Sequence, residues 1–379
     1  MLTPLNQLSW YFPDQPIGQT EIVSVEVDGV RYTAFVRAQA RAGYKEAARA
    51  FELRIAAELG ASATHAVFRA GAEVSVYSND DLLLTGFVDQ KRPHYSARNA
   101  HMVITGRSKA GDLIDSDPDH DTGHFENKDP AEIGAELAEG YGATFRTDQA
   151  LSKLESYQLT PGASIFREIE KMARRQGMTL SGTAEGDILI TKPDGSKRHA
   201  GGVFEGQNLL VGNADHNWSS RYSRYSFKGQ RILGHGARRL HMVATSKDGV
   251  VKRKRHKAVI HDDDGSIDDL KGRATNRRNR AAGEALKATI STAGFRDQAG
   301  KIWEPGYLVW IESPYLDIAQ DMLIEAVDFS SGPEGSLALL SLVDPRAFGG
   351  KGAGGGKGNK SGDEYEIDDS EAVDETPAD

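Results

Sequence analysis

The stretch from Asp115 to Glu126 combines carboxylates and imidazoles at spacings that metal sites use. Its acidic residues fill positions 1, 3, 5, 7 and 12 of a calcium-loop pattern, namely Asp115, Asp117, Asp119, Asp121 and Glu126. That loop needs a glycine at position 6 for its sharp turn, and this position holds His120. We also expect no helix before the stretch. A solvated loop is therefore the favoured interpretation, and calcium binding is the alternative.

His120 and His124, with Asp121 beside the first, imitate the H-x-x-x-H spacing of zinc hydrolases. That chemistry requires a helix, because only a helix places both imidazoles on one face. Thr122 and Gly123 disfavour a helix here. The loop thus suggests a hydrolase only as the enzymatic alternative.

Neither a phosphate-binding loop nor a nucleophile motif is supported by the sequence. Residues 350–355 satisfy G-x-G-x-x-G, and residues 354–361 nearly match a phosphate loop, but an acidic stretch follows where a helix would have to hold the phosphates. We interpret this stretch as a flexible linker. A G-x-S-x-G nucleophile motif is absent from the sequence, and so is cysteine. We assign no catalytic residue, cofactor or metal ligand and predict that the protein is not an enzyme.

Two basic clusters remain. One is the run Lys252 to Lys257, and the other comprises Arg273, Arg277, Arg278 and Arg280. Such clusters are usually a solvated loop and the polar face of a helix. The alternative is a surface that contacts DNA or an acidic partner. The basic run has no interleaved aromatic residues for base stacking.

Composition limits the possible classes of protein. The 379 residues include no cysteine, which excludes disulfides, and the length suggests several domains. The net charge of -9 arises from residues 363–379, which contain nine acidic residues and no basic one. The remaining chain is formally neutral, so nothing global points to nucleic acid. We find no targeting segment and no apolar stretch of about 18 residues, and we expect a soluble protein made in a bacterial cytoplasm.

Hydrophobic periodicity divides the chain into segments. In residues 21–107, short alternating runs predict strands, with Asp28-Gly29 as a hairpin turn between 22–27 and 30–36, and further strands at 51–58, 73–78, 82–91 and 100–107. This pattern favours an antiparallel barrel or sandwich.

Residues 108–202 change period and predict a small α+β unit. One helix should begin at Asp129-Pro130, and a second should span about 163–176 with Ile165, Ile169 and Met172 on its apolar face and Glu168 among the polar residues. A hairpin over Glu185-Gly186 should follow.

The remainder is β at both ends, with strands from Tyr222 and at 307–311, 322–329 and 336–343, and a basic insertion with one helix at about 267–288. The predicted divisions are an N-terminal extension 1–20, a first β-barrel 21–107, an α+β domain 108–202, a second β-barrel 203–230 and 302–348, an inserted domain 231–301, and a disordered tail 349–379. The fold class is therefore α+β and β-rich.

Three blocks carry a family resemblance. They are residues 106–115 (GRSKAGDLID), residues 206–210 (GQNLL) followed by 221–230 (RYSRYSFKGQ), and residues 302–309 (IWEPGYLV). In this order and spacing, the chain resembles the central hub proteins of Mu-type contractile phage baseplates. The resemblance extends over about residues 22–348.

The resemblance implies two tube-like barrels joined by an α+β domain, with a further small domain inserted, and a homotrimer that presents six similar barrels. Such a ring would adapt a six-fold tail tube to a three-fold spike. The implied partners are the trimeric spike, the tube or its initiator, and other baseplate proteins, with transient passage of DNA through the central channel. If Arg273, Arg277, Arg278 and Arg280 of the basic insertion face that channel, they could influence DNA passage. The implied location is the virion baseplate, after assembly in the host cytoplasm. A secretion apparatus, a bacteriocin tail or a gene-transfer particle is the alternative machine, and a tail-associated cell-wall hydrolase is the enzymatic one.

Overall fold

The computed structural model describes residues 21–56, 67–97, 99–193, 195–229, 242–261 and 267–348. The predictions for the N-terminal extension 1–20 and for the Gly-rich and acidic tail 349–379 lie outside the described residues.

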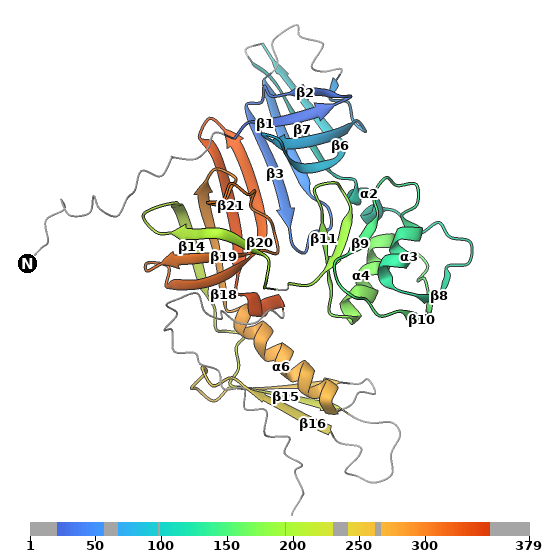
Figure 1. Cartoon of the computed structure of the whole chain (residues 1–379), viewed down its shortest axis with the longest axis vertical. Helices are drawn as coiled ribbons and strands as arrows, with labels where there is room; N and C mark the ends of the chain where they lie inside the picture. The colour runs from blue at the N-terminus through green and yellow to red at the C-terminus, as the bar shows by residue number, and fades with distance from the viewer. Residues whose placement is uncertain are drawn as a thin grey trace, which may run out of the picture.

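A sheet of 13 strands dominates the molecule (Figure 1). Its strands are β1 (Val23–Val27), β2 (Val30–Tyr32), β3 (Arg37–Gly43), β4 (Ala50–Ala56), β5 (Glu73–Ser78), β6 (Asp81–Ser96), β7 (Asn99–Ser108), β13 (Arg198–Phe204), β14 (Leu209–His216), β18 (Leu286–Ala293), β19 (Leu308–Ser313), β20 (Ile318–Gly332) and β21 (Gly335–Val343). The pairing order is β14-β18-β21-β20-β3-β4-β7-β6-β5-β1-β2, with β19 on β20 and β13 on β19. The β-rich class predicted from sequence is confirmed.

Local sequence explains most of these strands. Asp28 and Gly29 both adopt positive φ, 50° and 78°, as the predicted tight turn between β1 and β2 requires. The return strand β2 ends at Tyr32, four residues before the predicted end. The chain then enters β3, which was not predicted because its buried side chains are the small alanines at 38, 40 and 42, followed by the buried Gly43.

The two β halves form one sheet, whereas two separate barrels were expected. β3 pairs antiparallel with β20 from Ala326↔Gly43 to Ser331↔Ala38. In the part of the chain that the structure describes, the pairing path ends at β2 and at β14, and closure of either half into a barrel is not observed. One apolar core accordingly runs through both halves, from Val25 and Leu53 to Ile311 and Leu340.

Each half contains one unusually long strand with a β-bulge. The register of β6 shifts between Val88 and Gln90, and that of β20 shifts between Ile324 and Ala326. A bulge bends its strand and increases the local twist. A β-bulge in a long strand therefore curves each half of the sheet.

The α+β unit lies beside the first half (Figure 1). Its elements are α2 (Ala110–Asp115), β8 (His124–Lys128), α3 (Pro130–Leu137), β9 (Phe145–Thr147), β10 (Leu154–Gln158), α4 (Ile165–Arg175), β11 (Thr179–Gly182) and β12 (Ile188–Thr191). Asp129 caps α3 through the amides of Ala131 and Glu132, and the Glu132 side chain returns a hydrogen bond to the Asp129 amide, which confirms the predicted helix start. α2 shows that the expectation of no helix before residue 115 was wrong.

The insertion is a separate unit made of β15 (Arg224–Gly229), β16 (Met242–Lys247), β17 (His256–His261) and α6 (Ile267–Gly283). β15 was expected in the second barrel, but it pairs with β16 and β17 in a separate three-stranded sheet. The predicted helix ends at Gly283, and residues 286–293 form β18 in the large sheet. Leu270 and Ala274 of α6 pack on Phe227 and Ala244, so one face of this small sheet is covered by the helix. Where independent domains begin and end stays a prediction.

Among the described residues, no helix combines the length and the apolar character needed to cross a membrane.

Candidate assembly surfaces and junctions

The carboxylates of the 115–126 stretch do not converge. Asp115 is the last residue of α2 and binds Arg107, with Nη2 to Oδ2 at 2.7 Å, and this contact lowers the pKa of the Asp115 carboxyl. The other four acidic side chains are exposed. In the described segments, no group of three or more His, Cys, Asp or Glu side chains is arranged to hold a metal ion.

The two histidines of this stretch face different partners. His120 Nδ1 accepts a hydrogen bond from the Gly123 amide at 3.0 Å, and its Nε2 lies 3.2 Å from Glu136. His124 Nε2 lies 3.3 Å from Glu126. Residues 120–123 are not helical, as predicted, so the zinc-hydrolase arrangement is not formed.

We expect calcium to leave the stability of the protein unchanged. A ligand that binds only the native state raises the melting temperature, and the effect grows with the logarithm of its concentration relative to the dissociation constant. The scattered carboxylates offer no site for such binding. Thermal unfolding with millimolar CaCl₂ and with a chelator should agree within about 1 °C. A calcium-dependent rise that disappears on Asp119→Asn would contradict this expectation.

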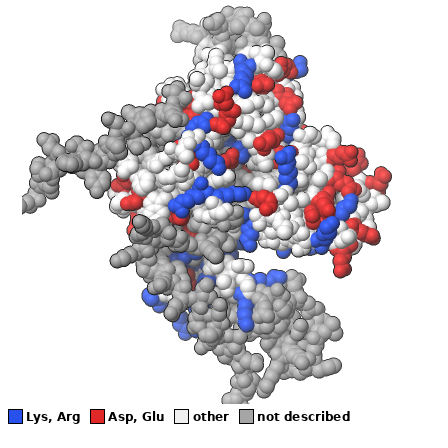
Figure 2. Space-filling model, viewed as in Figure 1, with Lys and Arg blue, Asp and Glu red and all other residues white. Residues whose placement is uncertain are grey.

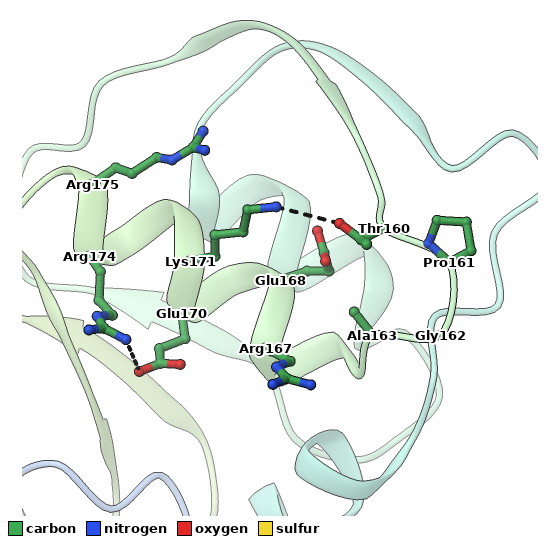
Figure 3. Close-up of a pocket in the computed structure, with 10 residues that line it drawn as sticks. All are labelled: Thr160, Pro161, Gly162, Ala163, Arg167, Glu168, Glu170, Lys171, Arg174 and Arg175. Atoms are coloured by element: carbon green, nitrogen blue, oxygen red, sulfur yellow. Dashed lines mark hydrogen bonds and ion pairs between the residues drawn. The ribbon is translucent and has the colours of Figure 1, made fainter. Parts of the chain in front are cut away.

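A basic depression of about 570 Å³ lies along α4 (Figure 3). Arg167, Lys171, Arg174 and Arg175 line it from successive turns, opposite residues 160–163. Glu168 was predicted on the polar face, but it is 1% exposed and accepts a hydrogen bond from the Tyr157 hydroxyl at 2.5 Å. Burial and this carboxylate raise the pKa of Tyr157, which therefore stays a donor. Glu170 also lines the depression and lies 3.5 Å from Arg174 Nη1, and Thr160 Oγ1 accepts a hydrogen bond from Lys171 Nζ at 3.5 Å. The four basic side chains suit an anionic group of a partner.

A groove of about 600 Å³ crosses the seam between the two halves of the sheet. It is lined by residues of β3, β4, β6, β7, β20 and β21, including Phe51 and Leu339. Arg41 bridges the seam, with Nη1 2.7 Å from Asp328 and Nη2 2.7 Å from Glu46. The mixture of charged and apolar side chains is typical of protein contact surfaces.

Arg49 joins three parts of the molecule. It precedes β4 and donates to the Gly182 carbonyl of β11 at 3.0 Å, to the Leu83 carbonyl of β6 at 2.8 Å and to Glu304 Oε2 at 3.0 Å. Gly182 lies so close to this segment that a Cβ would sit 2.4 Å from the Ala47 carbonyl oxygen. The first half, the α+β unit and the second half therefore meet at one buried guanidinium.

His199 and Asp297 form a buried pair that superficially resembles a catalytic dyad. His199 Nδ1 lies 2.9 Å from Asp297 Oδ2, and its Nε2 accepts the Glu304 amide at 3.1 Å. Because Nε2 is occupied by a backbone donor, the imidazole is neutral and has no free acceptor for a substrate. The imidazole ring of His199 packs against the rings of Trp303 and Tyr307. The pair fixes the loop before β19, and it could not be predicted from sequence because 98 residues separate the partners.

A second link between the halves is formed by Arg296 and Glu21. Arg296 Nε lies 3.1 Å from Glu21 Oε1, and Nη2 donates to the Ser78 carbonyl at 3.2 Å. Glu21 also accepts from the Ser78 hydroxyl at 2.6 Å. These bonds attach the β5–β6 turn to the loop after β18.

The basic clusters both lie in the insertion. Lys252, Arg253 and Lys254 are exposed in the loop between β16 and β17. Arg273, Arg277 and Arg280 share one side of α6 by their spacing. Figure 2 shows mixed charges over the large sheet, and mainly Lys and Arg on the visible part of the insertion.

The curved sheet in two halves, with an α+β unit and an inserted small sheet, is a fold that this chain shares with two solved tail proteins. A 43 kDa tail protein of prophage MuSo2 from Shewanella oneidensis has the same fold, with a TM-score of 0.76, 22% identity, and coverage of 86% of this chain and 99% of that one. A tail protein from Neisseria meningitidis MC58 matches with a TM-score of 0.71, 18% identity, and coverage of 88% and 100%.

Family profiles and a curated relative agree with this likeness. Residues 22–108 match the N-terminal domain of the Mu phage baseplate assembly protein GpP-like, residues 110–192 the second domain of the gp44-like baseplate hub protein, and residues 267–351 the fourth domain of the Mu phage baseplate assembly protein GpP. Baseplate hub protein gp44 of Escherichia phage Mu is 23% identical over 339 residues, which is 86% of this chain and 88% of that protein. The chain belongs to the Mu-type baseplate hub family, and its function is that of a structural hub protein of a tail baseplate.

Proposed function

We propose that the protein is the homotrimeric central hub that joins a six-fold tail tube to a three-fold spike. The observation that carries the proposal is the repetition of one device, a long bulged strand, in two β halves that share a seam. Each half would serve as one tube-like barrel module. Three copies of a chain with two similar modules place six similar surfaces around one axis, which is the simplest adapter between these symmetries.

The ends of the large sheet support ring formation. Its pairing path ends at β2 and at β14, where Val30, Leu210 and Val211 expose large apolar side chains. Soluble proteins protect unpaired strand edges because such edges pair readily with strands of other chains. An exposed edge on each side of one sheet suits a head-to-tail contact that closes into a ring. We place the β14 edge in the contact between subunits.

Val211→Lys is expected to convert the trimer to the monomer. The new ammonium would be desolvated in the interface, at a cost of several kcal/mol at each of the related contacts. Light scattering after size exclusion should give three times the 41.1 kDa chain mass for the original protein and the single chain mass for the variant. Ile260→Lys, at a position outside the large sheet that is 77% exposed against 61% for Val211, is the matched control and should stay trimeric. An original protein that remains monomeric at high concentration, with no ring in averaged electron images, would refute the trimer.

We further propose that the protein is not an enzyme, that it acts in the virion baseplate after assembly in the host cytoplasm, and that its partners are the spike, the tube or its initiator, and other baseplate proteins. DNA would pass through the central channel.

A hydrolase using His120 is the alternative. Peptidoglycan turnover by the pure protein that is lost on His120→Ala would favour it. A hub of another contractile machine is the second alternative, and neighbouring tape-measure and spike genes would favour a phage.

A further inference from the structure

The insertion has a charge balance unlike that of the rest of the chain. Residues 217–283 contain 17 Lys and Arg against 6 Asp and Glu, although the whole chain is net acidic. Asp248 is the single carboxylate among the described residues of 217–261, and it is held in a buried ion pair by Arg221 Nε at 2.6 Å. The positive charge of this unit is therefore not offset locally.

The basic side chains gather at the end of the insertion nearest the large sheet. Arg278 of α6 donates to the Lys247 carbonyl at 3.3 Å, and Lys247 pairs with Arg224 and lies where the 248–255 loop begins. The opposite end is marked by Gly229, where a Cβ would lie 3.1 Å from Leu270. We define the basic end of the insertion as Arg224, Lys252, Arg253, Lys254, Arg277 and Arg280. These six side chains form no ion pair within the described part of the chain.

The last described residues leave the body beside this end. The 3₁₀ helix η2 (Pro345–Phe348) packs on the C-terminus of α6, so closely that a Cβ on Gly283 would lie 2.0 Å from the Ala347 nitrogen. Phe348 is fixed by the Tyr44 ring, with centroids 5.3 Å apart, and by Lys45 Nζ at 4.0 Å. The chain thus continues from a defined point next to Arg280.

The acidic segment is within reach of this surface. Fourteen residues, 349–362, separate Phe348 from the nine carboxylates of 363–379. Fourteen residues span at most about 50 Å when fully extended. The 17-residue helix α6 is itself only about 25 Å long. The nine carboxylates are therefore within reach of the basic end.

We propose that the acidic segment 363–379 binds the basic end of the insertion of its own chain and screens it from other polyanions. Nucleic acid or an acidic partner could fill the same surface, but the tail is tethered beside it. A tether of this length gives an effective concentration on the order of 1 mM. A segment that binds in trans with a dissociation constant of about 100 μM would then occupy its site about nine-tenths of the time.

The test uses the full chain and a chain that ends at Gly362. A fluorescein-labelled peptide of residues 363–379 is titrated with each protein, and its anisotropy is measured at low and high salt. The truncated chain should bind the peptide about tenfold more tightly than the full chain, because its own tail no longer competes. Added salt should weaken binding, and a peptide with Asn and Gln in place of Asp and Glu should not bind.

Two matched variants of the truncated chain locate the site. The triple change Lys252→Gln, Arg253→Gln and Lys254→Gln should abolish peptide binding. The triple change Arg167→Gln, Arg174→Gln and Arg175→Gln removes the same charge from α4 and should preserve it. Equal peptide affinity for the full and truncated chains, or equal loss in both triple variants, would overturn the proposal. So would a labelled DNA duplex that binds both chains equally and is not displaced by the peptide, since the surface would then be open to nucleic acid.

Discussion

Arg49→Ala is expected to lower the free energy of unfolding by about 3–5 kcal/mol. The guanidinium is 8% exposed, and its partners are two backbone carbonyls and the Glu304 carboxylate. Removing it leaves a largely buried carboxylate without its cation and two carbonyls without a donor, whose desolvation is no longer compensated. Urea unfolding of the variant and the original chain measures the difference.

Two further changes separate the possible causes. Arg49→Met retains the apolar stem, so a loss nearly as large as that of the alanine variant would assign the effect to the hydrogen bonds and the ion pair. Arg54→Ala alters an exposed residue of the same strand, β4, and should change stability by no more than about 0.5 kcal/mol. Because Arg49 links three parts of the chain, we also expect its loss to separate the unfolding of the α+β unit from that of the sheet. A cost below about 1 kcal/mol, with one cooperative transition retained, would show that the junction is held elsewhere.

Local patterns in the sequence predicted the elements well where one residue type decides the conformation. Asp129-Pro130 defined the start of α3, and Asp28-Gly29 forms the turn after β1. The failures share a cause. The alternation of β3 is carried only by alanines, and Glu168 is buried because a distant tyrosine satisfies it, so short-range periodicity contained no signal for either.

Two of the three family blocks, the first and the third, gain a physical explanation from the junctions. Ser108 in the first block accepts the Arg49 amide at 3.0 Å, and Gly106 could not carry a Cβ, which would lie 2.0 Å from the Phe87 carbonyl oxygen. The third block contains Glu304, which binds Arg49 and, through its amide, His199. These contacts join residues between 59 and 255 positions apart. Spacing along the chain could therefore suggest that the blocks matter, but it could not pair them.

Asp297→Ala is expected to cost about 3–5 kcal/mol as well. The carboxylate accepts hydrogen bonds from His199 Nδ1 and from the amides of Ala200, Ala299 and Lys301, at 2.9 to 3.0 Å. All four donors would lose their acceptor in the variant, and the loop that carries Trp303 and Glu304 would lose its anchor. Asp80→Ala, at a fully exposed position in the β5–β6 turn, is the control and should be nearly neutral.

The same pair should make stability depend on pH. Burial lowers the pKa of His199, although Asp297 opposes this effect. Burial tends to raise the pKa of Asp297, but the hydrogen bonds from His199 and the backbone outweigh it, and the net shift is downward. Because the pKa of His199 is lower in the folded protein, the unfolded chain binds this proton at a higher pH than the folded protein does. Stability is therefore lost as the pH falls below about 6.5, with a slope of at most about 1.4 kcal/mol per pH unit. The lowered aspartate pKa adds a second loss below about pH 4.

The His199→Gln variant isolates the histidine contribution. Protonation of His199 would put a donor at Nε2 against the Glu304 amide, so the original protein should lose stability between pH 7 and pH 5 more steeply than the variant. His216→Gln changes an exposed histidine whose Nε2 contacts the Leu316 carbonyl at 2.9 Å, and it should keep the original slope. If His199→Gln leaves the slope unchanged while His216→Gln reduces it, the neutral buried imidazole is not the origin of the acid sensitivity.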